Sequence, residues 1–213
     1  MSMIFVIVSI CIMSIVTFTI INSYFNKIET NINLQDILQS LFLERNLDVK
    51  LLIKEKTRPY YDCGSKEMMI SKGNTVKNIA EGFHELGHAI DDHNTKDQGL
   101  YSNLSYLIMK YSITMALILY YMQPMFVENK LLPCVVFAFC GISIFFFSVL
   151  LKEEIVATKY ALKILSDTKI LNGRLFRNTQ TCLYNALTTY MVLLLISIII
   201  TVYQLIYVYG LFN

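Results

Sequence analysis

The sequence predicts a mainly α-helical integral membrane protein, with about four transmembrane helices and a small α+β soluble portion. Of the 213 residues, 55% are apolar and only 16% are charged, whereas soluble domains are nearer a quarter charged. The apolar residues lie in long runs, which is typical of membrane-spanning helices rather than of a soluble core. The charged residues gather between these runs, in two segments that we expect to form the soluble portion.

Four apolar runs have roughly the 20 residues that a helix needs to cross a bilayer. They cover residues 3–25, 106–127, 131–151 and 187–209. The first run has no basic segment before it and no small-residue cleavage site, so we expect an uncleaved transmembrane helix rather than a signal peptide. We therefore expect a multi-pass protein of the cell membrane, with residues 1–213 forming one membrane-embedded domain in contact with the lipid bilayer.

The soluble segments, residues 26–102 and 152–183, carry most of the basic residues. Ten Lys and Arg lie in residues 26–102 and six in residues 152–180. Because basic segments are retained in the cytoplasm, we expect both segments to be cytoplasmic and both termini to be outside. Two spans separate the segments, so they share one side of the membrane in either orientation. Side chains from both segments can therefore complete a single site.

The first soluble segment contains signals for a helix, two strands and a second helix. Apolar residues at helical spacing predict an amphipathic helix over residues 34–42. Residues 47–54 and 66–72 are typical of short strands, and the polar turn between them predicts a β-hairpin. Asn74-Thr75 offers an N-cap for a helix that we expect to end near residue 92.

The second of these helices carries the sequence His84-Glu85-Leu86-Gly87-His88, which reads H-E-x-x-H. Residues four apart lie on one face of a helix, so both imidazoles can reach a single metal ion. Glu85 then lies beside that ion, where its carboxylate can take a proton from a bound water. This pattern is the zincin signature and predicts a Zn²⁺ site with one ion per chain. The alternative is a chance string on a helix face.

A catalytic zinc site commonly has three protein ligands, so two histidines leave one ligand to be found. In a metzincin the third histidine ligand follows the second by six residues, whereas His93 follows His88 by five. We therefore interpret His93 as a solvated residue just beyond the helix. Two acids, Glu153 and Glu154, follow the third span. Either of them can return to the same side of the membrane as the histidines.

Helical spacing distinguishes the two acids. Glu154 shares a stripe with small residues, so another helix could approach it closely, whereas Glu153 shares a face with bulkier residues. The stripe contains Ala157, Thr158 and Ala161, and the bulkier face contains Val156 and Tyr160. Spacing therefore favours Glu154, and it leaves open the alternative that both acids mark the interfacial end of the span.

Four segments resemble the motifs of a known family, in the same order along the chain. Tyr61-Asp62-x-x-Ser65-Lys66 resembles H-Y-D-P-R-x-K, residues 84–90 resemble H-E-V-G-H-A-I/L, residues 154–158 resemble E-F-D-A-S, and residues 185–190 resemble N-A-A-x-T-Y. With these motifs and the order of its spans, nearly the whole chain resembles the YugP-like family of bacterial neutral zinc metallopeptidases. The second and third motifs are specific, and the other two are supportive.

The resemblance implies a gluzincin-like site, in which Glu154 joins His84 and His88 as the third ligand and Glu85 is the catalytic base. The chain departs from the family motifs at three positions, where Val156 replaces an acidic residue, Thr158 replaces Ser and Cys63 replaces Pro. More distant membrane gluzincins carry Asp at the Thr158 position, as a partner to a ligand histidine. A threonine there is a weaker, uncharged acceptor.

We therefore expect a membrane-bound zinc metalloendopeptidase that hydrolyses peptide bonds of membrane or membrane-proximal proteins. Tyr60, Tyr61, Arg174 and Tyr184 are unranked candidates for an oxyanion donor. The alternative is a catalytically silent membrane scaffold that retains a structural metal site. A transporter is disfavoured because the spans carry almost no charged residues, and a net charge of only +2 implies no nucleic-acid partner. The substrate and the oligomeric state stay open.

Overall fold

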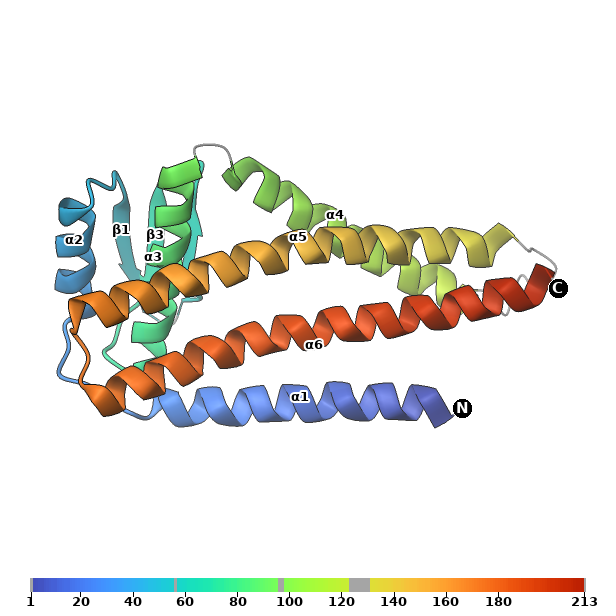
Figure 1. The fold of residues 1–213 in the computed structure, drawn as a ribbon, viewed down its shortest axis with the longest axis horizontal. Helices are drawn as coiled ribbons and strands as arrows, with labels where there is room; N and C mark the ends of the chain where they lie inside the picture. The colour runs from blue at the N-terminus through green and yellow to red at the C-terminus, as the bar shows by residue number, and fades with distance from the viewer. Residues whose placement is uncertain (1, 56, 96–97, 123–130, 213) are drawn as a thin grey trace. The chain divides into compact units, whose positions relative to one another are not determined.

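The computed structural model describes residues 2–55, 57–95, 98–122 and 131–212. Figure 1 shows the described elements in chain order. They are α1 (Ser2–Asn26), α2 (Leu34–Glu44), β1 (Lys50–Lys54), β2 (Tyr60–Asp62), β3 (Glu67–Ser71), α3 (Val76–Thr95), α4 (Gln98–Met122), α5 (Leu131–Thr168) and α6 (Gly173–Phe212). The mainly helical class and the small sheet that the sequence predicts are confirmed.

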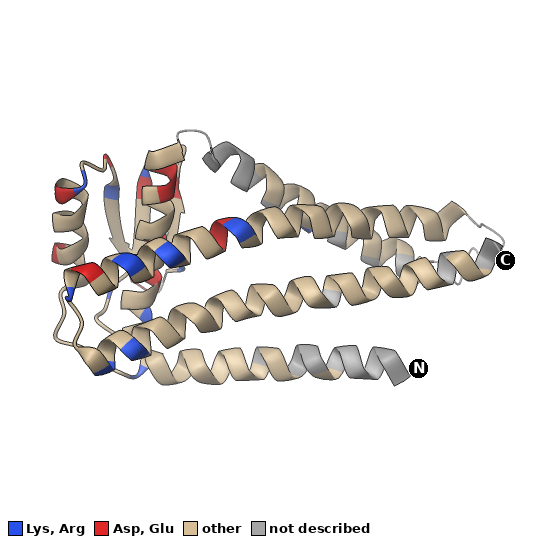
Figure 2. Cartoon of the chain, in the orientation of Figure 1, with Lys and Arg blue, Asp and Glu red and all other residues tan. Residues whose placement is uncertain are grey.

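The chain folds into two compact units, and each contains segments that are distant in sequence. The first unit contains Met1–Cys11, Tyr101–Leu151 and Tyr190–Asn213, and the second contains Ile12–Leu100 and Lys152–Thr189. The charged residues of the described chain lie in the second unit, apart from Lys110 on α4 (Figure 2). The organisation as one membrane-embedded domain stays a prediction.

The sheet in the second unit has three strands in the order β1-β3-β2. Both expected strands form, but the expectation that they pair with each other as a hairpin is wrong, because β1 and β3 are parallel. The polar segment between them contains a further strand, β2, which pairs antiparallel with β3 and makes the hairpin of the sheet. Tyr60 and Tyr61 explain this difference, since aromatic residues favour strands, and the turn signals apply only to residues 63–66.

The core of the second unit forms where α3 meets α2, the sheet and the second half of α5. Both predicted helices of this unit are present, and Thr75 accepts the Asn78 N–H at 3.2 Å as the N-cap of α3. The side chains of Phe83 and Leu86 are completely buried. The core also includes Leu34, Leu38, Met68, Ile79, Ala161, Ile164 and Leu165. This packing fixes α3 between the sheet and α5.

Two helices of the described chain are long and apolar enough to cross a membrane, and these are Leu131–Thr168 and Gly173–Ile206. The first contains the third predicted span, and the second contains the fourth predicted span up to residue 206. The first predicted span falls in α1 and the second falls partly in α4, with residues 123–127 outside the described part of the chain. In the first unit, α4, α5 and α6 pack around Ala116, Val136 and Cys140. The existence of four membrane spans stays a prediction.

Candidate metal centre

The two histidines of H-E-x-x-H lie on one face of α3, as their spacing predicts. Because α3 is helical across this stretch, His84 and His88 are one turn apart. Their Nε2 atoms are 3.2 Å from each other. Both side chains are largely buried, with 17% and 25% of their surfaces exposed. The α3 helix therefore presents two nitrogen donors at one point.

A carboxylate from α5 meets these two nitrogens. Glu154 places Oε2 at 2.9 Å from Nε2 of His84 and Oε1 at 3.8 Å from Nε2 of His88. One donor atom from each of the three residues lies within 4.8 Å of the others, so the group could hold a metal ion. Zinc bonds of about 2.0–2.2 Å in a tetrahedral site place donor atoms about 3.3–3.6 Å apart. The observed separations fall around that value, so the donor set fits zinc.

A backbone contact between α3 and α5 explains how Glu154 reaches the histidines. A Cβ added to Gly87 would lie 2.1 Å from the carbonyl oxygen of Ala157, so a side chain at position 87 would hold the two helices apart. On α5, Ala157 and Ala161 are completely buried and Thr158 is 3% exposed. The stripe of small residues thus faces α3, as its spacing predicts.

Thr158 contacts the far side of the His84 ring. Its Oγ1 lies 3.4 Å from Nδ1 of His84, the nitrogen that faces away from Glu154. When Nε2 is the metal-binding nitrogen, Nδ1 carries the hydrogen and donates to the threonine hydroxyl. The contact is at the limit of hydrogen-bond distance, so it orients the ring only weakly.

Burial and the neighbouring charges set the protonation of the cluster. Burial raises the pKa of Glu85 to about 7, against the opposing effects of the charge of His84 and of the backbone N–H of Tyr61. Burial and the charge of His84 lower the pKa of His88 to about 4. Burial would lower the pKa of His84, but the hydrogen bond to Glu154 and the charges of Glu154, Glu85 and Glu81 together outweigh burial and raise it. His88 is therefore a neutral donor at physiological pH.

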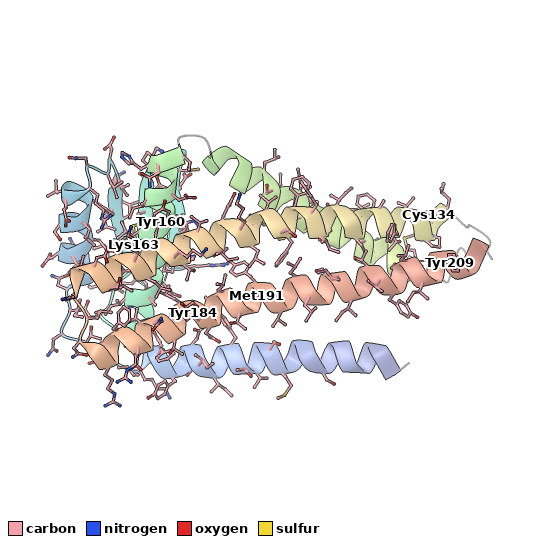
Figure 3. All side chains as sticks on the ribbon, viewed as in Figure 1. Cys134, Tyr160, Lys163, Tyr184, Met191 and Tyr209 are labelled. Carbon is pink, nitrogen blue, oxygen red and sulfur yellow. The ribbon has the colours of Figure 1, made fainter. Side chains whose placement is uncertain are left out.

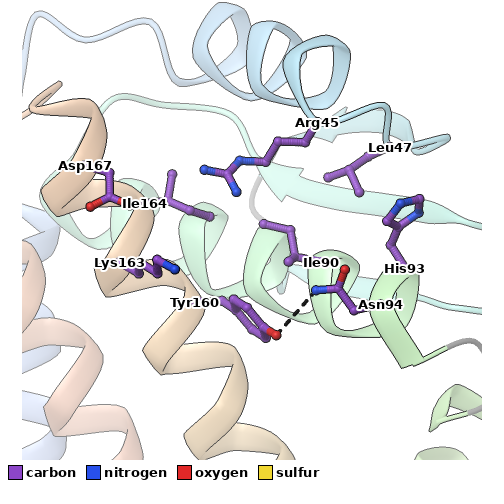
Figure 4. Close-up of a pocket in the computed structure, with 9 residues that line it drawn as sticks. All are labelled: Arg45, Leu47, Ile90, His93, Asn94, Tyr160, Lys163, Ile164 and Asp167. Carbon is purple, nitrogen blue, oxygen red and sulfur yellow. Dashed lines mark hydrogen bonds between the residues drawn. The ribbon is translucent and has the colours of Figure 1, made fainter.

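Several residues considered from the sequence lie apart from the three donors. His93 is exposed and lines a separate pocket of about 510 Å³ between α3, α5 and the end of α2 (Figure 4). In that pocket, Asn94 donates to the Tyr160 hydroxyl at 3.4 Å. Glu153 is not among the residues that form the metal-binding group in the described chain. Glu154, which spacing favours over Glu153, is the acid that meets the histidines.

The four candidate oxyanion donors also differ in their surroundings. Tyr60 and Tyr184, which lies on α6 (Figure 3), are 43% and 47% exposed. Arg174 is exposed. Tyr61 is half-buried, and its hydroxyl donates to Asp92 at 2.6 Å. Burial and this bond raise the pKa of Tyr61, so the phenol stays protonated and engaged with Asp92.

Two residues near the cluster did not stand out in the sequence. Asp92 lies where the sequence predicts that the helix ends, yet it is 8% exposed and binds two side chains from the β2–β3 hairpin. The positive charge of Arg58 acts on Glu154 and helps to lower its pKa. Arg58 lies in the loop before β2. The signal in the sequence that could have identified Arg58 is a basic residue close before the Tyr61-Asp62-x-x-Ser65-Lys66 motif.

Comparisons with known proteins add one match. A family model described as "Putative neutral zinc metallopeptidase" matches residues 1–210, almost the whole chain. No curated protein and no solved structure matches the chain. The resemblance that the sequence motifs carry is thus confirmed.

Proposed function

Because the chain belongs to the family of neutral zinc metallopeptidases, we propose that it is a membrane-bound zinc endopeptidase. Its substrates are membrane or membrane-proximal proteins. The observation that carries this proposal is the meeting of His84, His88 and Glu154 at zinc-like separations, with the half-buried Glu85 on the same helix as the two histidines. A structural metal site has no chemical need for a further carboxylate beside its ligands, so Glu85 favours a catalytic role.

The three donors would hold one Zn²⁺ per chain, through Nε2 of each histidine and the carboxylate of Glu154. These residues would thereby place Lewis acidity in the site, which would polarise the scissile carbonyl and lower the pKa of a bound water to about 7. Glu85 takes a proton from the attacking water and passes it to the leaving amine.

Strand β2 offers a place for an extended substrate. It pairs with β3 on one side, and its residue Tyr61 directs its backbone N–H to Glu85. In an antiparallel strand the N–H and C=O of one residue point to the same side, so the Tyr61 carbonyl also faces away from β3. An extended peptide could bind along this edge by backbone hydrogen bonds and place its scissile bond near Glu85.

The membrane assignment is supported by the helices of the first unit. Side chains of α5 and α6 such as Phe145, Ile206 and Tyr209 are 64%, 63% and 70% exposed. Large apolar surfaces of this kind need a non-aqueous partner, and a bilayer supplies one. We infer four spans from the four apolar runs. From the distribution of Lys and Arg, we infer that the metal centre lies on the cytoplasmic side and that both termini lie outside.

The test compares wild-type protein with Glu85→Gln in cells and after purification. Wild-type protein should contain about one zinc per chain and should generate fragments of membrane proteins. Glu85→Gln should keep the zinc, because Glu85 is not a ligand, and should generate none of these fragments. Equal fragment patterns from the two proteins would disprove the peptidase mechanism and would favour the silent scaffold.

A further inference from the structure

One buried carboxylate ties the β2–β3 hairpin to the metal-binding helix. Asp92 lies on α3, one turn beyond His88, and is 8% exposed. It accepts the hydroxyl of Tyr61 at 2.6 Å and the ammonium group of Lys66 at 2.5 Å. A buried charge is costly unless it is paired and hydrogen-bonded. Both partners of Asp92 therefore stabilise its position, and both come from the same hairpin.

The backbone of Lys66 indicates that its side chain is needed there. Lys66 ends the turn between β2 and β3 with a φ of 53°. Glycine adopts this left-handed conformation readily, whereas a residue with a Cβ is strained in it. The conformation of Lys66 destabilises the turn, whereas its ion pair with Asp92 stabilises it.

Tyr61 connects the same helix at a second point. Its hydroxyl binds Asp92, and its backbone N–H acts on the carboxyl group of Glu85 and lowers the pKa of that group. Glu85 and Asp92 are seven residues apart, so they lie two turns apart on one face of α3. One residue of the edge strand therefore spans two turns of the metal-binding helix, with its side chain at one end and its amide at the other.

We propose that Asp92 is a positioning residue, which holds Tyr61 and Lys66 so that the Tyr61 amide stays on Glu85. This role rests on the proposed function, in which Glu85 is the general base. Strand β2 has only three residues and pairs on one side, so its own hydrogen bonds hold it weakly. Without the Asp92 contacts, β2 moves away from α3 and Glu85 loses the amide that orients its carboxylate.

The kinetic test uses Asp92→Asn, Lys66→Met and Tyr61→Phe, which removes only the hydroxyl group of Tyr61. Each variant should keep its zinc and have a kcat lower by about 10-fold or more, with KM changed much less, because a misplaced base slows the chemical step. Lys66→Arg keeps the charge and should restore most of kcat. Lys50→Met is the matched control, since Lys50 lies on β1, at the edge of the sheet opposite β2, and forms an ion pair with Glu67 at 2.6 Å. It should have wild-type kinetics.

Backbone strain can be separated from the side-chain role with two glycine variants. Lys66→Gly relaxes the turn but removes the ion pair, so it should lower kcat as Lys66→Met does. Lys169→Gly is its control, because Lys169 has a φ of 51° and is exposed beyond α5. It should leave kcat unchanged. Wild-type kcat in both Lys66→Gly and Asp92→Asn would overturn the positioning role.

Amide hydrogen exchange tests the contact without any activity measurement. Peptides that cover residues 57–66 should exchange faster in Asp92→Asn than in wild-type protein or in Lys50→Met. Unchanged exchange would show that Asp92 does not hold β2, and faster exchange with unchanged kcat would show that it does not position the base. Faster exchange in a protein whose wild type cleaves no peptide would disprove the proposed peptidase function and leave the hold on β2 supported.

Discussion

Helix α3 carries two buried glycines that face its neighbours in different ways. A Cβ on Gly82 would lie 2.9 Å from Cδ2 of Leu34, which is the far end of a flexible side chain on α2. A Cβ on Gly87 would lie 2.1 Å from the carbonyl oxygen of Ala157, which belongs to the backbone of α5. The first contact can adjust by a rotation of Leu34, and the second cannot adjust without moving a helix. The rigid contact is the one beside His84 and His88.

Gly87→Ala should produce the largest effect. Alanine favours a helix over glycine by about 1 kcal/mol, but overpacking costs about 1–3 kcal/mol or more when the backbone has to shift. Because the clash is with backbone, we expect a cost at the upper end of this range, which leaves a net loss of about 2 kcal/mol. We also expect loss of zinc, because α5 carries Glu154 away from the histidines. Thermal unfolding and zinc content of the purified protein measure both effects.

A second substitution at the contact partner sharpens this prediction. Ala157→Gly should not rescue Gly87→Ala, since the clash is with the carbonyl oxygen of Ala157 and not with its side chain. Rescue by Ala157→Gly, or a stable Gly87→Ala protein with a full complement of zinc, would show that α3 and α5 are not in backbone contact at this point.

Glu154→Gln should have the next largest effect and tests what the α3–α5 contact achieves. Residues that hydrogen-bond to metal ligands contribute about 10–100-fold to the affinity for the metal. Loss of a ligand itself should therefore weaken zinc binding by more than this. Glu153→Gln is the matched control on the same helix and should bind zinc as wild-type protein does. Zinc titration of the two purified variants measures the difference. Weak binding by Glu153→Gln together with normal binding by Glu154→Gln would reverse the assignment.

The sequence predicted the meeting of His84, His88 and Glu154 better than the pairing of the strands, and the reason is physical. Helix geometry alone places two histidines four residues apart on one face, and it places the acid on a stripe of small residues that another helix can approach. These three side chains meet in the structure. Strand pairing depends on contacts between distant segments, so the parallel pairing of β1 with β3 could not be read from local signals. Asp92 was missed for the same reason, because its partners lie about 26–31 residues earlier in the chain.

The pH dependence of zinc binding tests the electrostatics of the rigid contact. Glu154 raises the pKa of His84, so His84 holds its proton to a higher pH than the usual histidine value of about 6.5. Zinc must displace this proton to bind. As the pH is lowered, the affinity for zinc should therefore begin to decrease at a pH above 6.5, and it should decrease by about 10-fold per pH unit below the pKa of His84. His88, with a pKa of about 4, contributes nothing in this range.

The matched measurement uses the residue that causes the shift. In Glu154→Gln, the pKa of His84 should be lower, so the fall in zinc affinity should begin at a lower pH than in wild-type protein. Calorimetric zinc titrations between about pH 5 and 8, where histidine titrates, locate each onset. The same onset in both proteins would contradict the coupling between Glu154 and His84.

Thr158→Val should have a smaller effect, since its hydroxyl is 3.4 Å from His84 Nδ1. Partners of metal-binding histidines contribute about 10–100-fold in affinity, and this long, uncharged contact should lie at or below the lower end. Thr158→Ser keeps the hydroxyl and serves as the control, whereas Thr158→Asp should bind zinc more tightly than wild-type protein. A loss of 100-fold or more in Thr158→Val would show that Thr158 orients His84 strongly.

Gly82→Ala should have the smallest effect and completes the comparison of the two glycines. The helix gains about 1 kcal/mol from alanine, and the displacement of the Leu34 methyl group costs a similar amount, so the stability change should be within about 1 kcal/mol of zero. Leu34 is 2% exposed, and its freedom to rotate decides the sign. Gly82→Ala combined with Leu34→Met should be more stable than Gly82→Ala alone, because methionine is unbranched and fills irregular spaces. A loss as large as that of Gly87→Ala would mean that α2 is held as rigidly as α5.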